Sequence, residues 1–116
     1  MKITVKAEGG ATIVMLEGRL DLATGASLKE ATKKICDKGA KRIHLNLQMV
    51  DFINSSGLGA LVSVMKQVRL NKGRLTLSNL ATYVREIFEI TQLNHIFDIY
   101  ETQQEAVASA EKVAVE

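Results

Sequence analysis

Polar and apolar residues alternate along several short stretches of the chain, and this period of two predicts β-strands. Residues 2–7 and 41–48 alternate in this way, as does the shorter stretch 74–78. Residues 11–17 are rich in β-branched and apolar side chains, and the Glu-Gly-Gly sequence at 8–10 is typical of a tight turn. We therefore expect 2–7 and 11–17 to pair as a β-hairpin.

Other segments repeat their apolar residues at spacings of three and four, which predicts amphipathic helices. One helix ends near Gly39, and either Thr24 or Ser27 could cap its start, since Ser27 and Glu30 have the capping-box spacing. A second runs from 55 to about 71. Its expected buried side is formed by Leu58, Leu61, Val62, Met65 and Val68.

Two further helices are expected in the last third of the chain. Asn79 could cap the first of them, and the second begins near Thr102. Between them, residues 93–99 return apolar side chains to the core as a short edge segment. We treat residues 1–116 as a single domain and expect the end, about 112–116, to fray.

The order of these elements indicates an α/β fold with a mixed sheet of four to five strands. Strands that are covered by helices on both faces are nearly continuous apolar runs, whereas these alternate. We therefore expect the helices to pack mainly on one face and to leave the other relatively polar. His44 lies on that polar side, and we expect it to be an ordinary surface histidine.

Composition and charge argue against several classes of function and site. Fifteen basic and 13 acidic residues leave a net charge of +2, which gives no support to nucleic-acid or membrane binding. Cys36 is the only cysteine, so no intrachain disulfide and no thiolate metal cluster can form, and its helical position predicts a buried thiol. No apolar run approaches the ~20 residues that span a bilayer, and the first residues lack a signal-peptide pattern. We expect a cytoplasmic protein.

Motifs for catalysis are also missing from the sequence. There is no P-loop lysine pattern, no His-x-x-x-His, no carboxylate pair at useful spacing and no Gly-x-Ser-x-Gly elbow. We therefore expect no enzymatic activity, no metal and no cofactor.

The most distinctive stretch is 52–59, where a loop enters the second helix. Asn54, Ser55 and Ser56 are all able to cap the helix, and its positive end tolerates a phosphate. Gly57 and Gly59 leave the backbone of the first turn uncovered, so another surface can approach it.

Three segments together resemble the STAS family of anti-sigma factor antagonists. They are Gly18-Arg19-Leu20-Asp21, Leu45-Asn46-Leu47 and Phe52-Ile53-Asn54-Ser55-Ser56-Gly57-Leu58-Gly59. The similarity extends from about Ile3 to Ala108.

The resemblance implies a STAS fold and a partner-switching function. The unphosphorylated form would bind an anti-sigma factor that is also a serine kinase, and would thereby free a sigma factor. Phosphorylation of Ser55 would release the kinase, and a serine phosphatase would reset the switch. Asp21 matches an acidic position expected beside the phosphosite. The family usually has Asp where this chain has Asn54, and some members bind nucleotides weakly.

A docking surface follows from the helical periodicity of 55–71. The side opposite the buried stripe, together with the first turn, is formed by Leu58, Gly59, Ser63, Lys66, Gln67 and Leu70, with Ala60 and Val64 at its edge. Two alternative functions stay open: an accessory subunit of a lipid-transport ABC complex, in which Ser55 is never modified, and a nucleotide-sensing module that uses the surface around Asp21 and Ser55.

Overall fold

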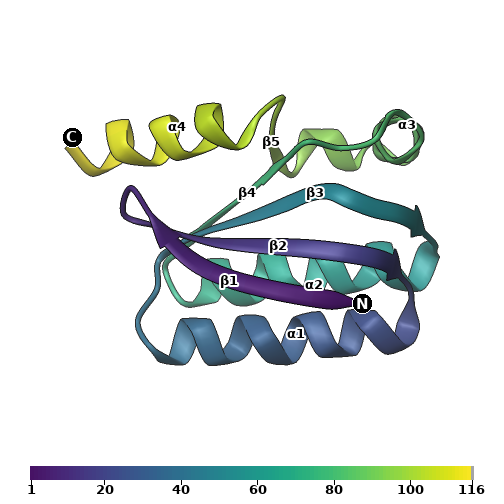
Figure 1. Cartoon of the computed structure of the whole chain (residues 1–116), viewed down its shortest axis with the longest axis horizontal. Helices are drawn as coiled ribbons and strands as arrows, with labels where there is room; N and C mark the ends of the chain where they lie inside the picture. Colours follow the sequence, from purple (N-terminus) through teal and green to yellow (C-terminus); the bar gives the residue numbers. More distant parts are fainter. Residues whose placement is uncertain (116) are drawn as a thin grey trace.

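The computed structural model describes residues 1–115, with side chains described for 1–109, as a five-stranded mixed sheet and four α-helices (Figure 1). The strands lie in the order β1 (Lys2–Glu8), β2 (Ala11–Leu20), β3 (Arg42–Ile53), β4 (Arg74–Ser78) and β5 (Asp98–Tyr100). β1 and β2 form the expected antiparallel hairpin, and β2 to β5 are parallel. The predicted mixed sheet is therefore confirmed.

The main core lies between the sheet and two helices that run side by side beneath it, α1 (Leu22–Asp37) and α2 (Ser55–Leu70) (Figure 1). Apolar side chains of β2, β3 and β4 meet those of the two helices there, and Cys36 is buried among them as predicted. The short α3 (Thr82–Ile90) adds Val84 and Phe88 to the same core, and a 3-10 turn, η1 (Leu93–His95), leads on to β5. Among the residues described, no helix is long and apolar enough to cross a membrane.

The opposite face of the sheet is partly covered by α4 (Gln103–Val115), as Figure 1 shows. Ala106 and Val107 are buried there, and Val107 packs with Ala11 and Ile13. The polar side of β3 therefore does not face water along its whole length.

His44 illustrates the consequence, because the prediction that it is a surface histidine is wrong. Its side chain is 1% exposed, and it lines a very small cavity together with Ala106 of α4. The ring nitrogens lie 2.8 Å from the Thr76 hydroxyl and 2.7 Å from the Ser78 hydroxyl, both on β4. Burial lowers the pKa of His44 to about 4. The imidazole is thus a neutral link between two strands.

Two strands are longer than predicted. β2 continues to Leu20 rather than ending at Glu17, and β3 continues to Ile53 rather than ending at Gln48. The pairing of the two strands shifts register between Met15 and Glu17, and again after Gly18. Such irregularities break the alternation of side chains, so a period of two cannot trace the strands beyond them. The outer strand β1 is mostly exposed, including Val5.

The helix caps also differ from the expectation at two places. Asp21, and not Thr24 or Ser27, is the N-cap of α1. α3 starts after Ala81 without a side-chain cap, while Asn79 adopts a left-handed conformation with φ of 59°. The predicted fraying of 112–116 concerns an end that lies outside the residues with described side chains.

Candidate regulatory site at the start of α2

The candidate site is formed where two neighbouring parallel strands end. Leu20 of β2 lies opposite Ile53 of β3, and the next residue of each strand begins a helix cap. The backbone N–H of Asn54 donates to the Leu20 carbonyl over 3.3 Å. α1 and α2 therefore start side by side at one edge of the sheet (Figure 1). This arrangement places Asp21 at the same edge of the sheet as the segment 54–57.

At the start of α2, the cap is provided by Asn54. Its side-chain oxygen accepts from the backbone N–H of Gly57 over 2.9 Å. Ser55 and Ser56 are the first two residues of the helix, and both are exposed. Because the amide of Asn54 already serves as the cap, the hydroxyl of Ser55 is not used for this purpose.

Gly57 is required at its position by the close approach of another strand. A Cβ atom there would lie 2.1 Å from the carbonyl oxygen of Leu20, a contact no side chain tolerates. Gly59, in contrast, has open space around its Cα. The backbone left uncovered by Gly57 is therefore occupied by β2, and only that of Gly59 is accessible to a partner.

At the start of α1, Asp21 and Thr24 form a capping box. The Thr24 N–H donates to the Asp21 carboxylate over 3.1 Å, and the Asp21 N–H donates to the Thr24 hydroxyl over 2.9 Å. The backbone N–H and the hydroxyl of Thr24 hold the pKa of Asp21 below its usual value, and Arg19 acts in the same direction. Asp21 is thus an ionised carboxylate beside the Ser55 segment.

Two residues at this edge were not identified as site residues from the sequence. The Tyr83 hydroxyl, on α3, accepts from the backbone N–H of Ile53 over 2.8 Å. The Arg19 guanidinium lies 3.9 Å above the ring centroid of Phe52, its cross-strand neighbour. Tyr83 is distant from Ile53 in the sequence, and no local pattern signals such a contact.

The predicted docking surface on α2 is only partly exposed. Gly59, Ser63 and Lys66 are exposed, Gln67 is half-buried, and Leu70 is 86% exposed at the end of the helix. Leu58 is half-buried and packs against the core.

The placement of Ala60 and Val64 at the edge of this surface is wrong. Both are buried. At Ala60 the reason is the close approach of α1 at Gly25, where an added Cβ would lie 2.7 Å from the Ala60 Cβ.

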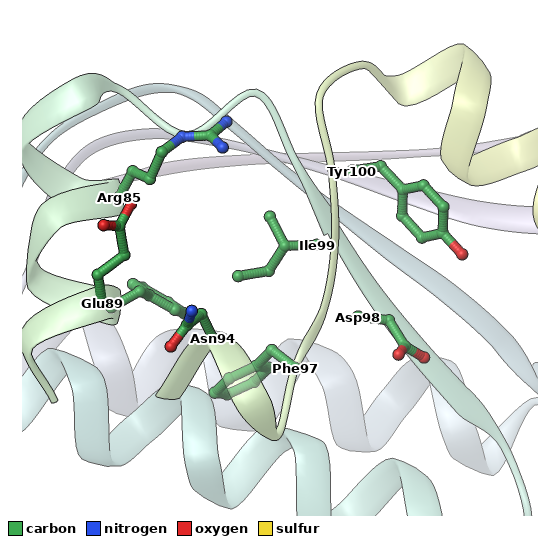
Figure 2. A pocket seen from close by; sticks show the side chains of 8 residues that line it. Arg85, Glu89, Asn94, Phe97, Asp98, Ile99 and Tyr100 are labelled. Carbon is green, nitrogen blue, oxygen red and sulfur yellow. The ribbon is translucent and has the colours of Figure 1, made fainter. Parts of the chain in front are cut away.

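A separate cleft of about 440 Å³ opens between α3 and β5. Figure 2 shows Arg85 and Glu89 on its α3 side, Asn94 below them and Ile99 directed into it from β5. None of the predicted site residues lines this cleft. In the part of the chain that the structure describes, no group of His, Cys, Asp or Glu side chains is arranged to hold a metal ion.

Comparison with known proteins identifies the family. Residues 2–106 match the STAS domain. This chain belongs to the STAS domain family. One relative, BtrV of Bordetella bronchiseptica, is assigned as an anti-sigma factor antagonist and matches this chain over almost its whole length. It is 36% identical over 115 residues, which cover 99% of this chain and 98% of BtrV. The anti-sigma-B factor antagonist of Bacillus subtilis is 30% identical over 99 residues, covering 85% of this STAS domain and 90% of the relative.

Solved structures agree on the fold of this STAS domain. An assigned anti-sigma factor antagonist from Thermotoga maritima superposes with a TM-score of 0.85 at 26% identity, with 92% of each chain covered. The anti-sigma factor antagonist SpoIIAA, in its unphosphorylated form, gives a TM-score of 0.70 at 19% identity over 97% of this chain and 98% of SpoIIAA. At that identity SpoIIAA supports the fold alone. The two curated relatives described above are thus both named as antagonists of an anti-sigma factor.

Proposed function

We propose that this STAS domain is an anti-sigma factor antagonist that switches partners through phosphorylation of Ser55. The unphosphorylated form binds an anti-sigma factor that is also a serine kinase, and this binding frees the sigma factor. The phosphorylated form is released, and a serine phosphatase resets it. The observation that carries the proposal is the exposed Ser55 at the first position of α2, with its hydroxyl not used by the helix cap.

Ser55 is the phosphate acceptor in this proposal and not a catalyst. Its Oγ attacks the γ-phosphorus of ATP, the new O–P bond replaces the bond to the β-phosphate oxygen, and ADP leaves. The proton of the hydroxyl passes to a base of the kinase, which also supplies Mg²⁺. No residue of this chain needs to act as a base, so Asn54 in place of an aspartate does not prevent the reaction.

The position of Ser55 explains how a phosphate can change binding without changing the fold. Phosphoserine adds about −1.5 to −2 charges and three acceptor oxygens. The N-terminus of α2 stabilises that charge, and the neutral Asn54 adds no repulsion. Inside a protein interface, the same group must lose its water shell and meets acidic groups of the partner. A loss of about 3 kcal/mol weakens binding by about a hundredfold, which is sufficient for a switch.

The partner is proposed to dock on the exposed side of α2. Gly59, Ser63 and Lys66 are exposed along the helix that begins with Ser55, and Leu70 places a large apolar side chain at its far end. A surface with small residues near the phosphosite allows the kinase to approach the acceptor hydroxyl closely. Asp21 lies at the N-cap of the neighbouring helix α1, and Ser56 and Gly57 follow the acceptor in the first turn of α2.

A binding experiment tests the proposal. The chain is used to capture a candidate serine kinase of the anti-sigma factor type, with and without ATP, and the intact mass is measured after each reaction. We expect one added phosphate on the wild type and none on Ser55→Ala, with Ser55→Ala retaining the kinase in ATP and Ser55→Asp failing to bind it. Ser56→Ala is the matched control and should behave as the wild type. Equal binding by Ser55→Ala and Ser55→Asp would refute the switch.

A further inference from the structure

β3 extends well past its neighbour β4, and this leaves part of its edge without a strand partner. β4 pairs with β3 only from Arg42 to Asn46, whereas β3 continues to Ile53. From residue 47 onward, β3 is paired with β2 alone. In parallel strands successive residues direct their backbone groups to opposite sides, so alternate peptide groups of this stretch need partners other than a strand.

At Ile53 that partner is a side chain. The Ile53 N–H donates to the Tyr83 hydroxyl over 2.8 Å, and the hydroxyl lies 3.4 Å from the Ile53 carbonyl oxygen, to which it can donate in turn. The next N–H, that of Asn54, points the other way and donates to Leu20 of β2. The two residues before Ser55 are therefore held from opposite sides, by α3 and by β2.

We infer that Tyr83 is a positioning residue for the Ser55 switch. Its hydroxyl fixes the peptide group from which the Asn54–Ser55 turn leaves β3, and it ties α3 to that turn. Phosphoryl transfer depends on the placement of the acceptor oxygen, because a small misplacement of a reacting atom costs a large part of the rate. Tyr83 is also 40% exposed, so its ring reaches the surface at the same edge. The inference rests on the proposed function of Ser55.

Tyr83→Phe is the appropriate variant, since it removes one oxygen atom and keeps the ring. Tyr100→Phe is its matched control. It removes the same atom from a hydroxyl that contacts Arg74 and Ser109, at the β5–α4 side of the fold and without contact to Ile53. Thermal unfolding of both variants verifies that each is folded before the comparison is made.

The first measurement needs no partner protein. Amide hydrogen exchange followed by NMR should show Ile53 exchanging about tenfold faster in Tyr83→Phe than in the wild type, and unchanged in Tyr100→Phe. Unchanged exchange at Ile53 in Tyr83→Phe would overturn the inference, because the bond would then not hold the turn.

The second measurement uses the serine kinase that phosphorylates wild-type Ser55. In Tyr83→Phe we expect kcat to fall about fivefold or more, with the KM for this chain within about twofold, and Tyr100→Phe to match the wild type. Faster exchange without a loss in kcat would assign the bond a structural role only and overturn the inference. If wild-type Ser55 receives no phosphate, the proposed function itself is refuted. The wild-type reaction is measured first, so this outcome is distinguished from a failure of the inference about Tyr83.

Discussion

Helices α1 and α2 start at the same edge of the sheet, from neighbouring parallel strands, but the two starts are built differently. In α1 the third residue is Thr24, whose hydroxyl and N–H complete a capping box with Asp21. In α2 the third residue is Gly57, which has no side chain because the Leu20 carbonyl occupies that space. At the start of α1, side chain and backbone therefore hydrogen-bond to each other in both directions. At the start of α2 only Asn54 caps the helix, and the hydroxyls of Ser55 and Ser56 are not used for capping.

The two caps also differ in charge. Asp21 is a carboxylate whose pKa is lowered by the groups of Thr24, while Asn54 is a neutral amide that accepts a hydrogen bond in the same way. The comparison teaches that one backbone arrangement can serve two purposes. With a charged, reciprocal cap it stabilises a helix, and with a neutral, one-sided cap it leaves exposed the Ser55 hydroxyl that we propose as the phosphate acceptor.

The largest change in stability is expected from disturbing the close approach of Gly57 to the Leu20 carbonyl. Gly57→Ala places a methyl group against the Leu20 backbone and should lower the free energy of unfolding by about 3 kcal/mol. Gly59→Ala, two residues along the same helix, meets open space and should raise stability by up to about 1 kcal/mol. Urea unfolding of both variants gives the comparison, and similar midpoints for the two would contradict the close contact.

A change in the free energy of unfolding of almost the same size is expected from His44 when the pH is lowered. This change comes from a buried residue of the sheet and not from a helix cap. Because burial lowers the pKa of His44 to about 4 in the folded state, the unfolded chain binds the extra proton first. Stability should therefore fall by roughly 2–3 kcal/mol as the pH decreases from about 6.5 to about 4.

Unfolding free energies measured between pH 7 and pH 4 would test this. His44→Gln should remove most of the slope, and the exposed His95 provides the control, because His95→Gln should retain it. A slope that survives in His44→Gln would show that another group titrates in this interval.

A smaller effect distinguishes Asn54, the cap of α2, from Ser55, the proposed phosphate acceptor. Asn54→Ala removes the side chain that bonds to the Gly57 N–H and should cost about 1 kcal/mol of stability. Ser55→Ala, one residue later, should change stability by less than about 0.5 kcal/mol, because its hydroxyl is not the cap. Thermal unfolding of the pair measures the difference, and a larger loss for Ser55→Ala would move the cap to Ser55.

The smallest effect is expected when the α1 cap is made to resemble that of α2. The lowered pKa of Asp21 means that its stabilising contribution is complete above about pH 4 and is lost as the pH falls further, through the lowered value. Asp21→Asn should flatten the stability profile below pH 4 and leave the profile above it unchanged. An unaltered acid limb would mean that the capping box does not depend on the charge of Asp21.

Much of this site could be predicted because its signals are local. The order of strands and helices follows from periodicity, and the exposure of Ser55 at a helix start follows from a polar cluster placed before an apolar-periodic run. The sequence did not reveal which of three adjacent polar residues forms the cap. Asn54, Ser55 and Ser56 have similar propensities, and the choice was made by where β3 ends.

The features that were missed depend on contacts between distant segments. His44 alternates with apolar residues as a surface residue would, and only the placement of α4 over that face buries it. Ala60 lies at the edge of the apolar stripe of α2, and the close approach of α1 at Gly25 covers it. Tyr83 contacts Ile53 across 30 residues. The pattern of apolar and polar residues within one strand or helix cannot specify which other strand or helix will cover it.

Among the side chains that the structure describes, the main apolar cluster contains none from α4. The buried ones of α4 instead meet Ala11 and Ile13 in a separate small group or lie over the polar side of β3. The last helix extends away from the edge where α2 begins (Figure 1). A reporter or affinity tag joined after this helix would therefore be carried at a distance from Ser55, and it would leave the proposed phosphorylation site unobstructed.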